Sequence, residues 1–359
     1  MKLVITTNGD KKLLERLDGF PIEWISARLP RDRIGSSTSL PNNIKNMSKE
    51  NIREYIDRVH SKGLKFNYIL DSICLGNIEY TPKGMDEILK MFDWIVDLGI
   101  DGVTFSNPLL IRVFKERFPR LKIGSSLSIM WSWIEKRIEY FGNLGVDWII
   151  LPTSLNRYLR CLKNLTKRLN CELWLIANSG CLYHCPFVFD HANFLSHLSN
   201  YTAPFQYTNY FNLNCKKIIL EKPYNLIKSP WIRPEDLCFY EKLGYSTFVI
   251  QPNSSQTEEF LEIIRAYSNR KYRGDLMNLL SFMGEKFYTK DDTFPKGLPF
   301  INNDKLKDFL VNFPDKNCAE FLCEECRYCI KISKKAVTSF DIKKRKKILQ
   351  NYEKAIEKI

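Results

Sequence analysis

The sequence has no long hydrophobic run. Its longest apolar stretches, such as Trp148–Pro152, fall far short of the roughly 20 residues that cross a bilayer, and no signal-peptide segment follows Met1. We therefore expect a cytoplasmic protein without a membrane span. Of the 359 residues, 44% are hydrophobic and 26% are charged. This composition excludes a disordered chain, a collagen-like chain and a disulfide miniprotein.

Several catalytic signatures are also missing. The chain has no His-Glu-x-x-His zinc-protease helix, no Walker A loop, no Gly-x-Ser-x-Gly elbow and no Gly-x-Gly-x-x-Gly turn after its first predicted strand. The cysteine spacing typical of radical S-adenosylmethionine enzymes also fails, because Val188 stands where the third cysteine is needed. The function must therefore be sought in other residues.

Eight short β-branched or aromatic runs alternate with helical patterns along residues 1–270. Eight strands joined by helices are typical of a (β/α)8 TIM-type barrel, which we predict for this α/β chain. The predicted strands are Leu3–Thr6, Ile22–Ala27, Lys65–Asp71, Gly102–Asn107, Lys122–Ser128, Trp148–Thr153, Glu172–Ser179 and Thr247–Pro252. The clearest predicted helices are Lys49–Ser61, Gly84–Leu98, Pro108–Phe118, Trp131–Leu144 and Ser154–Leu169.

Two segments are additional to the eight strand–helix units of a minimal barrel. One is a Cys-rich insertion at residues 180–245, after the seventh strand, and the other is a Cys-rich extension at residues 271–330. A basic helix or tail follows at residues 331–359, with ten Lys or Arg and three acidic residues. The tail thus supplies +7 of the net charge of +13. It is predicted to contact tRNA or rRNA phosphates, and a solvated basic helix is the alternative.

The eleven cysteines are better explained by metal ligation than by disulfides, since the protein is expected in a reducing compartment. Cys181 and Cys185 directly follow the seventh predicted strand, on the active face of a barrel, and Cys215 and Cys238 lie further along the insertion. Four such thiolates are suited to an iron–sulfur cluster or a zinc ion. Cys74, after the third strand, is the alternative fourth ligand.

A second group is formed by Cys318, Cys323, Cys326 and Cys329. Four thiolates within twelve residues can surround one metal centre with little loop-closure cost. The tight C-x2-C-x2-C core is similar to ferredoxin-type binding, but the x3-Cys-Pro ending is absent. The group therefore predicts either a second 4Fe–4S cluster or a zinc site.

Polar side chains gather beside the first cysteine pair. Three of the four histidines, His184, His191 and His197, lie within the insertion together with Asn193. They are predicted to position substrate or to transfer protons. Ordinary polar side chains of a loop and a helix are the alternative interpretation.

Four segments resemble the collagenase-like peptidase family U32: Cys74-Leu75-Gly76-Asn77, Gly180–Phe187, His191–His197 and Ser229–Cys238. The resemblance covers roughly residues 1–270 and extends toward the Cys-rich extension. It implies a TIM-type barrel and, in several members, a 4Fe–4S cluster whose cysteine ligands include one in an Asp-Leu-Cys sequence. Because Asp236-Leu237-Cys238 reproduces that sequence, Cys238 ranks ahead of Cys74 as the fourth ligand.

The resemblance also implies a kind of chemistry. Members with assigned roles carry out oxygen-independent hydroxylation of tRNA uridine, rRNA cytidine or ubiquinone precursors, with prephenate implicated as oxygen donor in some. Clustered thiolates suit such chemistry, so the leading prediction is an iron–sulfur-dependent, hydroxylase-like enzyme that modifies RNA or a small molecule. A metal-dependent collagenase-like peptidase is one alternative. A non-catalytic iron–sulfur subunit bound to a paralogous barrel protein is another.

One position departs from the family pattern. Members commonly end the last barrel strand with Gly-Arg, whereas this chain has Pro252-Asn253 after its last predicted strand. An anion contact for a prephenate-like cosubstrate is therefore missing at that position. Arg233 and Arg28 are the candidates to replace it, and Arg233 is included among the predicted catalytic residues.

Overall fold

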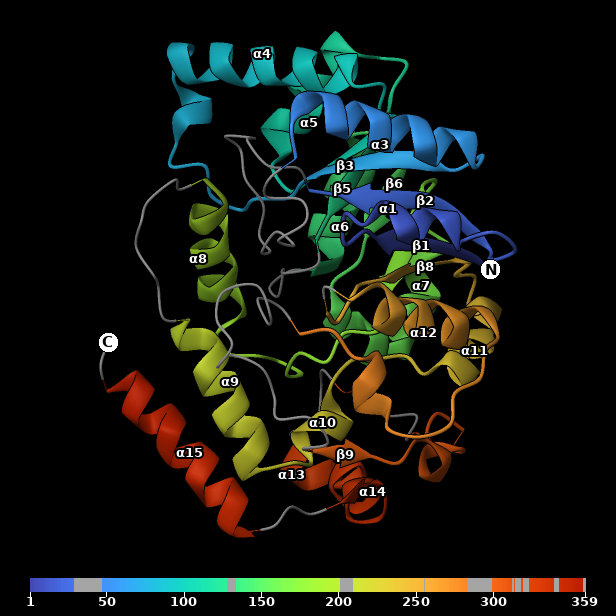
Figure 1. Ribbon diagram of the computed structural model, residues 1–359, viewed down its shortest axis with the longest axis vertical. Helices are drawn as coiled ribbons and strands as arrows, with labels where there is room; N and C mark the ends of the chain where they lie inside the picture. Colours follow the sequence, from blue (N-terminus) through green and yellow to red (C-terminus); the bar gives the residue numbers. More distant parts are fainter. Residues whose placement is uncertain are drawn as a thin grey trace.

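Eight parallel strands close into a barrel in chain order, with β1 hydrogen-bonded to both β2 and β8 (Figure 1). The computed structural model describes residues 1–28, 47–127, 134–200, 209–254, 256–282, 299–311, 313, 318, 323–338 and 342–357. The (β/α)8 barrel predicted from the alternating runs is confirmed.

All eight predicted strands are found, most of them shorter at the carboxyl end. The chain leaves the sheet there and forms the loops that surround the barrel mouth. The end of the predicted strand at Ser128 lies outside the described residues. The strands are β1 (Lys2–Thr6), β2 (Ile22–Ala27), β3 (Lys65–Leu70), β4 (Gly102–Phe105), β5 (Lys122–Ser126), β6 (Trp148–Ile150), β7 (Glu172–Ile176) and β8 (Thr247–Ile250).

Several helices around the barrel begin at ordinary capping residues. The Ser48 hydroxyl accepts a hydrogen bond from the Asn51 amide, and the Thr81 hydroxyl accepts one from the Gly84 amide, ahead of α3 and α4. The outer helices are α1 (Lys11–Glu15), α3 (Lys49–Ser61), α4 (Pro82–Asp97), α5 (Pro108–Arg117), α6 (Ile134–Asn143), α7 (Leu159–Leu165) and α12 (Thr257–Ser268).

The helix predicted at Ser154–Leu169 is broken near its start. A 3-10 turn, η2 (Thr153–Arg157), precedes the short α7. The side chain of Asn156 donates to the carbonyl oxygens of Ile176 and Pro230, both at 2.8 Å, so it is held between β7 and the insertion. These buried hydrogen bonds favour the turn over a continuous helix.

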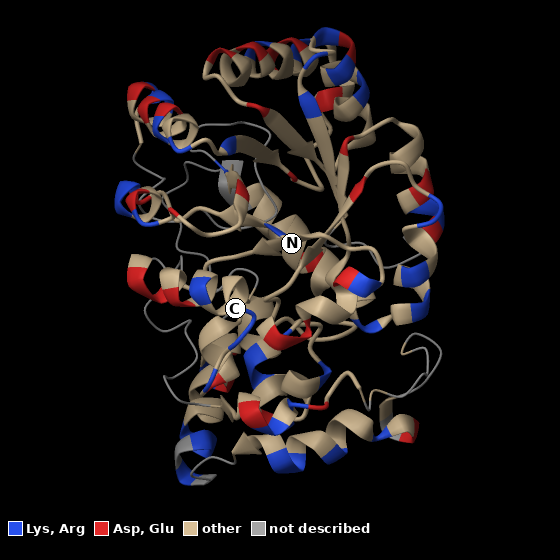
Figure 2. Cartoon of the chain, turned by 90° about the vertical axis from the view of Figure 1, so that its right-hand side faces the viewer, with Lys and Arg blue, Asp and Glu red and all other residues tan. Residues whose placement is uncertain are grey.

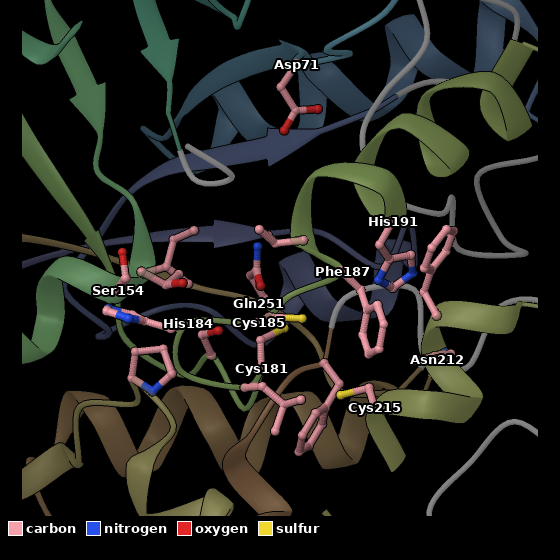
Figure 3. A pocket seen from close by; sticks show the side chains of 18 of the residues that line it. Asp71, Ser154, Cys181, His184, Cys185, Phe187, His191, Asn212, Cys215 and Gln251 are labelled. Carbon is pink, nitrogen blue, oxygen red and sulfur yellow. The ribbon is translucent and has the colours of Figure 1, made fainter. Parts of the chain in front are cut away.

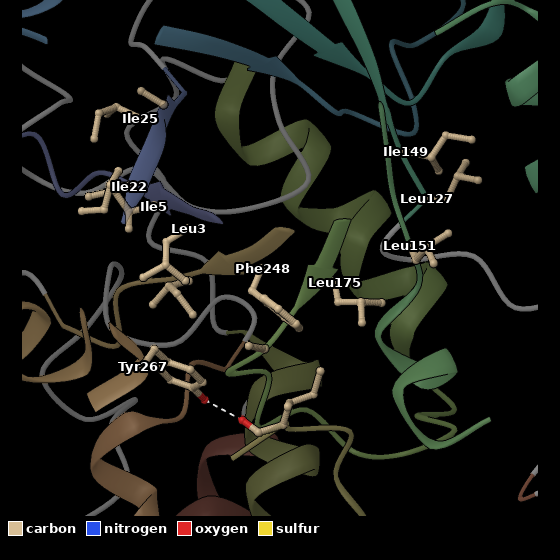
Figure 4. Packing of buried hydrophobic residues seen from close by; sticks show 14 of the residues in the cluster. Leu3, Ile5, Ile22, Ile25, Leu127, Ile149, Leu151, Leu175, Phe248 and Tyr267 are labelled. Carbon is tan, nitrogen blue, oxygen red and sulfur yellow. Dashed lines mark hydrogen bonds between the residues drawn. The ribbon is translucent and has the colours of Figure 1, made fainter. Parts of the chain in front are cut away.

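Two apolar layers lie on the two sides of the strands. Outward-facing side chains such as Leu3, Leu175 and Phe248 pack under the helices (Figure 4). Inside the barrel, Trp148 and Trp174 stack with ring centroids 4.6 Å apart, near the amino ends of the strands. The tryptophans fill that end of the barrel, so an internal cavity can open only toward the carboxyl ends.

The insertion and the extension form a further layer of helices beside the barrel (Figure 1). The insertion contains α8 (Val188–Asn200), α9 (Tyr210–Glu221), α10 (Asn225–Lys228), the turn η3 (Pro234–Asp236) and α11 (Leu237–Lys242). The extension contains the turns η4 (Leu276–Leu279) and η6 (Asn303–Leu306), the small antiparallel pair β9 (Phe300–Ile301) and β10 (Val337–Thr338), and helices α13 (Cys323–Cys326), α14 (Tyr328–Ala336) and α15 (Ile342–Ile356).

The basic C-terminal segment forms α15, which packs along α9. Tyr352 is buried against Leu213 and Leu220, and Lys217 forms an ion pair with Glu353 at 2.9 Å. The apolar side of α15 is therefore covered by the insertion.

Acidic and basic side chains are interspersed over the outer helices, as Figure 2 shows. Many form exposed ion pairs, such as Arg117 with Asp93 at 2.8 Å and Lys122 with Asp147 at 2.6 Å. Exposed pairs of this kind contribute little stability, typically about 0–1 kcal/mol. In the described part of the chain, no helix is long and apolar enough to cross a membrane.

Candidate active site at the barrel mouth

A cavity opens at the carboxyl ends of the strands, between the barrel and the insertion (Figure 3). It encloses about 1020 Å³, including its open mouth. Residues from the loops after β2, β3, β6, β7 and β8 line it together with side chains of α8 and α9. This is the end at which TIM-barrel enzymes carry their active sites.

Three cysteines line this cavity. Cys181 and Cys185 lie on the loop after β7, and Cys215 projects from α9 (Figure 3). Burial raises the pKa of the Cys185 thiol to about 12, and the neighbouring Cys181 adds to the effect. Cysteines about 30 residues apart in the sequence thus contribute thiols to the same wall of the cavity.

The two candidates for a fourth ligand lie elsewhere. Cys238 is exposed on α11, where its thiol lies 3.6 Å from the Glu235 carbonyl oxygen. Cys74 is partly buried in the loop after β3, and its carbonyl oxygen accepts from the Ser72 hydroxyl. Neither is among the described residues that line the cavity. The structure therefore brings together three of the four predicted ligands.

The cavity cysteines fit an iron–sulfur cluster in the chemistry of their donors. Thiolates are the usual ligands of such clusters, and these three come from two elements that face one space. Among the described residues, no group of three or more His, Cys, Asp or Glu side chains is already arranged around a metal position. Side chains of the group would therefore have to rotate toward one another to bind a metal.

His191 is the most strongly perturbed base in the cavity. Its side chain on α8 is only 6% exposed, and its ring stacks against Phe211 with centroids 5.5 Å apart. The Asn209 amide nitrogen donates to His191 Nε2 at 3.2 Å, while the Asn209 amide oxygen accepts from the Asn212 backbone. Burial lowers the pKa of His191 to about 4. The imidazole is therefore neutral near pH 7, with its proton on Nδ1.

The other predicted polar residues divide into two groups. His184 lines the cavity in a left-handed conformation with a φ of 52°, and its ring stacks on Tyr183. Burial lowers the pKa of His184. His197 and Asn193, also on α8, are half-buried and are not among the described cavity residues. Two of the three histidines are thus brought to the site.

A buried ion pair lies at the barrel mouth. Arg28, directly after β2, donates to both carboxylate oxygens of Asp71, directly after β3, at 2.9 and 3.4 Å. Both side chains are less than 10% exposed and line the cavity. Of the two predicted replacements for the missing family arginine, Arg28 is therefore the one at the cavity, with its charge already balanced by Asp71.

Arg233 lies outside the cavity wall. It is 2% exposed and forms two hydrogen bonds to the carboxylate of Asp236, at 2.7 and 2.8 Å. It also donates to the carbonyl oxygens of Asn303 and Lys307. These contacts connect the insertion to the C-terminal extension. The structure therefore gives Arg233 a structural role and does not place it in the cavity as a catalytic residue.

The second cysteine group lies where the extension packs on the barrel. Burial raises the pKa of Cys318 to about 11 and that of Cys329 to about 12. In both cases the nearby positive charge of Arg157 opposes the increase, while Cys323 and Cys326 add to it. Cys323 and Cys326 therefore lie close enough to act on Cys318 and Cys329, but the described thiols are not arranged around a metal position.

The sequence reasoning did not single out several residues of these sites. Asp71 was included only as the end of a strand, and Ser154, Phe211, Gln251 and Arg157 were not considered as site residues. Their positions after the carboxyl ends of predicted strands could have identified Ser154 and Gln251. The positions of Phe211 and Arg157 depend on how the insertion packs on the barrel, and no local sequence pattern indicates that packing.

Comparison with known proteins identifies similar sequences and a similar fold. Residues 35–184 match the model of peptidase family U32. An uncharacterized protease of Methanocaldococcus jannaschii is 28% identical over 290 residues, which cover 80% of this chain and 82% of that protein. A solved U32 peptidase structure superposes with a TM-score of 0.50 at 18% identity, covering 70% of this chain and 92% of the other, and shows the same fold. The family model and the M. jannaschii relative confirm the resemblance to peptidase family U32 that the sequence motifs indicated.

Proposed function

We propose that this chain is an iron–sulfur-dependent, hydroxylase-like enzyme whose active site is the barrel-mouth cavity. The observation that carries the proposal is the position of Cys181, Cys185 and Cys215 on the wall of one cavity at the catalytic end of the barrel. A cluster held by these thiolates would supply electron transfer or Lewis acidity to a bound substrate. The fourth ligand would come from substrate or from another side chain of the cavity.

The residues around the cysteines have distinct roles in this proposal. His191 is neutral and keeps its Nε2 occupied by Asn209, so Nδ1–H is the group available as a hydrogen-bond donor. The Arg28–Asp71 pair would orient a polar substrate group at the mouth without adding net charge. These residues position a substrate, and they exclude water when it binds.

The cavity wall favours a substrate with a flat ring. Phe187, Phe211 and Phe282 line the cavity. Aromatic side chains stack on nucleobases and on other planar rings. This wall supports a nucleobase or an aromatic small molecule as the substrate class.

RNA is the macromolecular partner that we propose. On α15, Lys343, Lys346 and Lys347 are exposed, while the apolar side of the helix packs on α9. The same α9 carries Phe211 and Cys215 into the cavity. A phosphate backbone bound along α15 would therefore run beside the element that lines the active site.

A metal-dependent peptidase is the second candidate. The M. jannaschii relative is named a protease, and the family name is that of a peptidase. Cleavage of gelatin or of a peptide panel by metal-replete protein, abolished in a cavity-cysteine variant, would support it. A non-catalytic role beside a paralogous barrel protein would instead show as co-purification with that protein.

Metal analysis tests the leading proposal. Protein purified without oxygen should contain iron and sulfide, with the visible absorption and EPR spectra of a 4Fe–4S cluster. Cys181→Ala combined with Cys185→Ala should remove about four irons and four sulfides per chain. Cys171→Ala is the matched control, because Cys171 is partly buried outside the cavity. Protein with zinc and no sulfide, or an unchanged double variant, would contradict the proposal.

A further inference from the structure

Arg157 is a buried cation without an ion-pair partner in the described part of the chain. Its side chain, at the end of η2, is only 2% exposed. One Nη donates to the carbonyl oxygen of Ser229 at 2.8 Å. Its Nε, also buried, has no hydrogen-bond partner among the described residues. A buried guanidinium is costly unless a negative charge compensates it.

Aromatic rings hold Arg157 in place. Its guanidinium carbon lies 4.4 Å from the ring centroid of Trp231 and 4.9 Å from that of Phe309. Phe309 packs in turn against Tyr328, whose hydroxyl donates to the Phe309 carbonyl oxygen at 2.8 Å. Tyr328 begins α14, between Cys326 and Cys329. The guanidinium is therefore clamped at the junction between the barrel and the cysteine-bearing helices.

The C-terminal cysteines can supply a balancing charge, because Tyr328, which packs against Phe309 beside Arg157, directly precedes Cys329 on α14. The positive charge of Arg157 lowers the pKa of both the Cys318 and the Cys329 thiols, against the effect of burial. Four thiolates around a divalent zinc ion, or around a 4Fe–4S cluster with a core charge of about +2, carry a net charge of about −2. One buried guanidinium would offset half of that charge.

We propose that Cys318, Cys323, Cys326 and Cys329 form a tetrathiolate metal centre, and that Arg157 is its buried counter-charge. Arg157 is a positioning residue here, since it acts on the ligands and does not bind the metal. Arg157 also connects to the barrel-mouth loop, because it donates to the Ser229 carbonyl oxygen, and the Ser229 hydroxyl donates to the carbonyl oxygen of Gly180, the residue before Cys181. Metal binding at the extension would therefore hold the loop that carries the cavity cysteines.

The test measures zinc, iron and sulfide in the full-length protein purified without oxygen. Cys318→Ala combined with Cys329→Ala should remove one zinc per chain, or about four irons with four sulfides. Arg157→Gln should raise the rate of metal loss to a chelator about tenfold or more, the size expected when a partner of metal ligands is removed. Arg157→Lys keeps the charge and should retain most of the resistance. Arg160→Gln, an exposed neighbour, should behave as the wild type.

Two results would overturn the inference. Full wild-type metal and sulfide in the Cys318/Cys329 double variant would exclude a centre at these residues. Unchanged chelator resistance in Arg157→Gln would exclude the counter-charge role. If Arg157→Gln fails to fold, as circular dichroism would show, the Arg157→Lys variant and the cysteine double variant decide the question. The Cys181/Cys185 variant reports on the cavity separately, so failure at one site is distinguishable from failure at the other.

Discussion

Stability should fall in mild acid because of His191. The side chain is buried against Phe211 and accepts a hydrogen bond from Asn209, which leaves no room for a proton on Nε2. Burial lowers the pKa of His191 in the folded protein to about 4, against an ordinary value of 6.5. Between these values the unfolded chain binds a proton that the folded chain excludes. Stability therefore rises with pH across this window and is lost as the pH falls.

The size of the effect follows from the two pKa values. A folded-state value of about 4 and an unfolded value of 6.5 give a loss of about 2 kcal/mol at pH 5 and about 3 kcal/mol at pH 4, relative to pH 7. This contribution is fully present above about pH 6.5 and is lost progressively down to about pH 4. It is a large fraction of the 5–15 kcal/mol that typically stabilises a folded protein.

Urea denaturation at pH 7, 6, 5 and 4 measures this contribution. His191→Gln has no titratable group at this position and keeps an acceptor for the Asn209 amide, so its free energy of unfolding should depend less on pH. The difference between wild type and variant should change by about 3 kcal/mol from pH 7 to pH 4. His197→Gln, on the same helix and half-buried, is the matched control and should follow the wild type. Parallel pH profiles for wild type and His191→Gln would refute the reasoning.

Three further perturbations test the packing. Gly124→Ala should destabilise the barrel by about 1–3 kcal/mol in urea, because its new Cβ would clash with the Trp148 indole, and an unchanged midpoint would contradict this packing. Asp236→Asn leaves the buried Arg233 charge unpaired and should cost about 3 kcal/mol or more in the same assay, whereas a loss below 1 kcal/mol would show that solvent reaches the pair. Tyr352→Ala should release α15 to limited proteolysis, and an unchanged digestion pattern would mean that the helix is held elsewhere.

The barrel could be predicted because its signal is local and repeated. Each strand is a short apolar run bounded by polar residues, and eight of them alternate with helical patterns. The strand ends were less predictable, because Leu127, Leu151 and Ala177 continue the apolar runs past the ends of β5, β6 and β7. The prediction of a helix at Ser154–Leu169 was wrong at its start, because Asn156 forms buried hydrogen bonds to Ile176 and Pro230. Those partners are distant in the sequence, and no local pattern could supply them.

The candidate site was predictable only in part. Cys181 and Cys185 follow a strand directly, so their place at the barrel mouth follows from the topology. The position of the Cys238 thiol depends on the turn that precedes it. There, Asp236 bonds to Arg233 and the following helix α11 leaves the Cys238 thiol exposed. The Asp-Leu-Cys sequence therefore marks a resemblance to the family without determining where the Cys238 sulfur points.

Helix α9 contacts both the cavity and the basic helix α15. One side of α9 contributes Phe211 and Cys215 to the cavity wall, and another side contributes Leu213 and Leu220 to the contact with α15. A rotation of α9 that moves Cys215 toward the other cavity thiols would also shift the surface on which Tyr352 packs. If the proposed metal centre and the proposed RNA contact both form, loading the cavity with metal should change the exposure of α15. RNA bound to α15 should then change metal retention, because coupling between two sites is reciprocal.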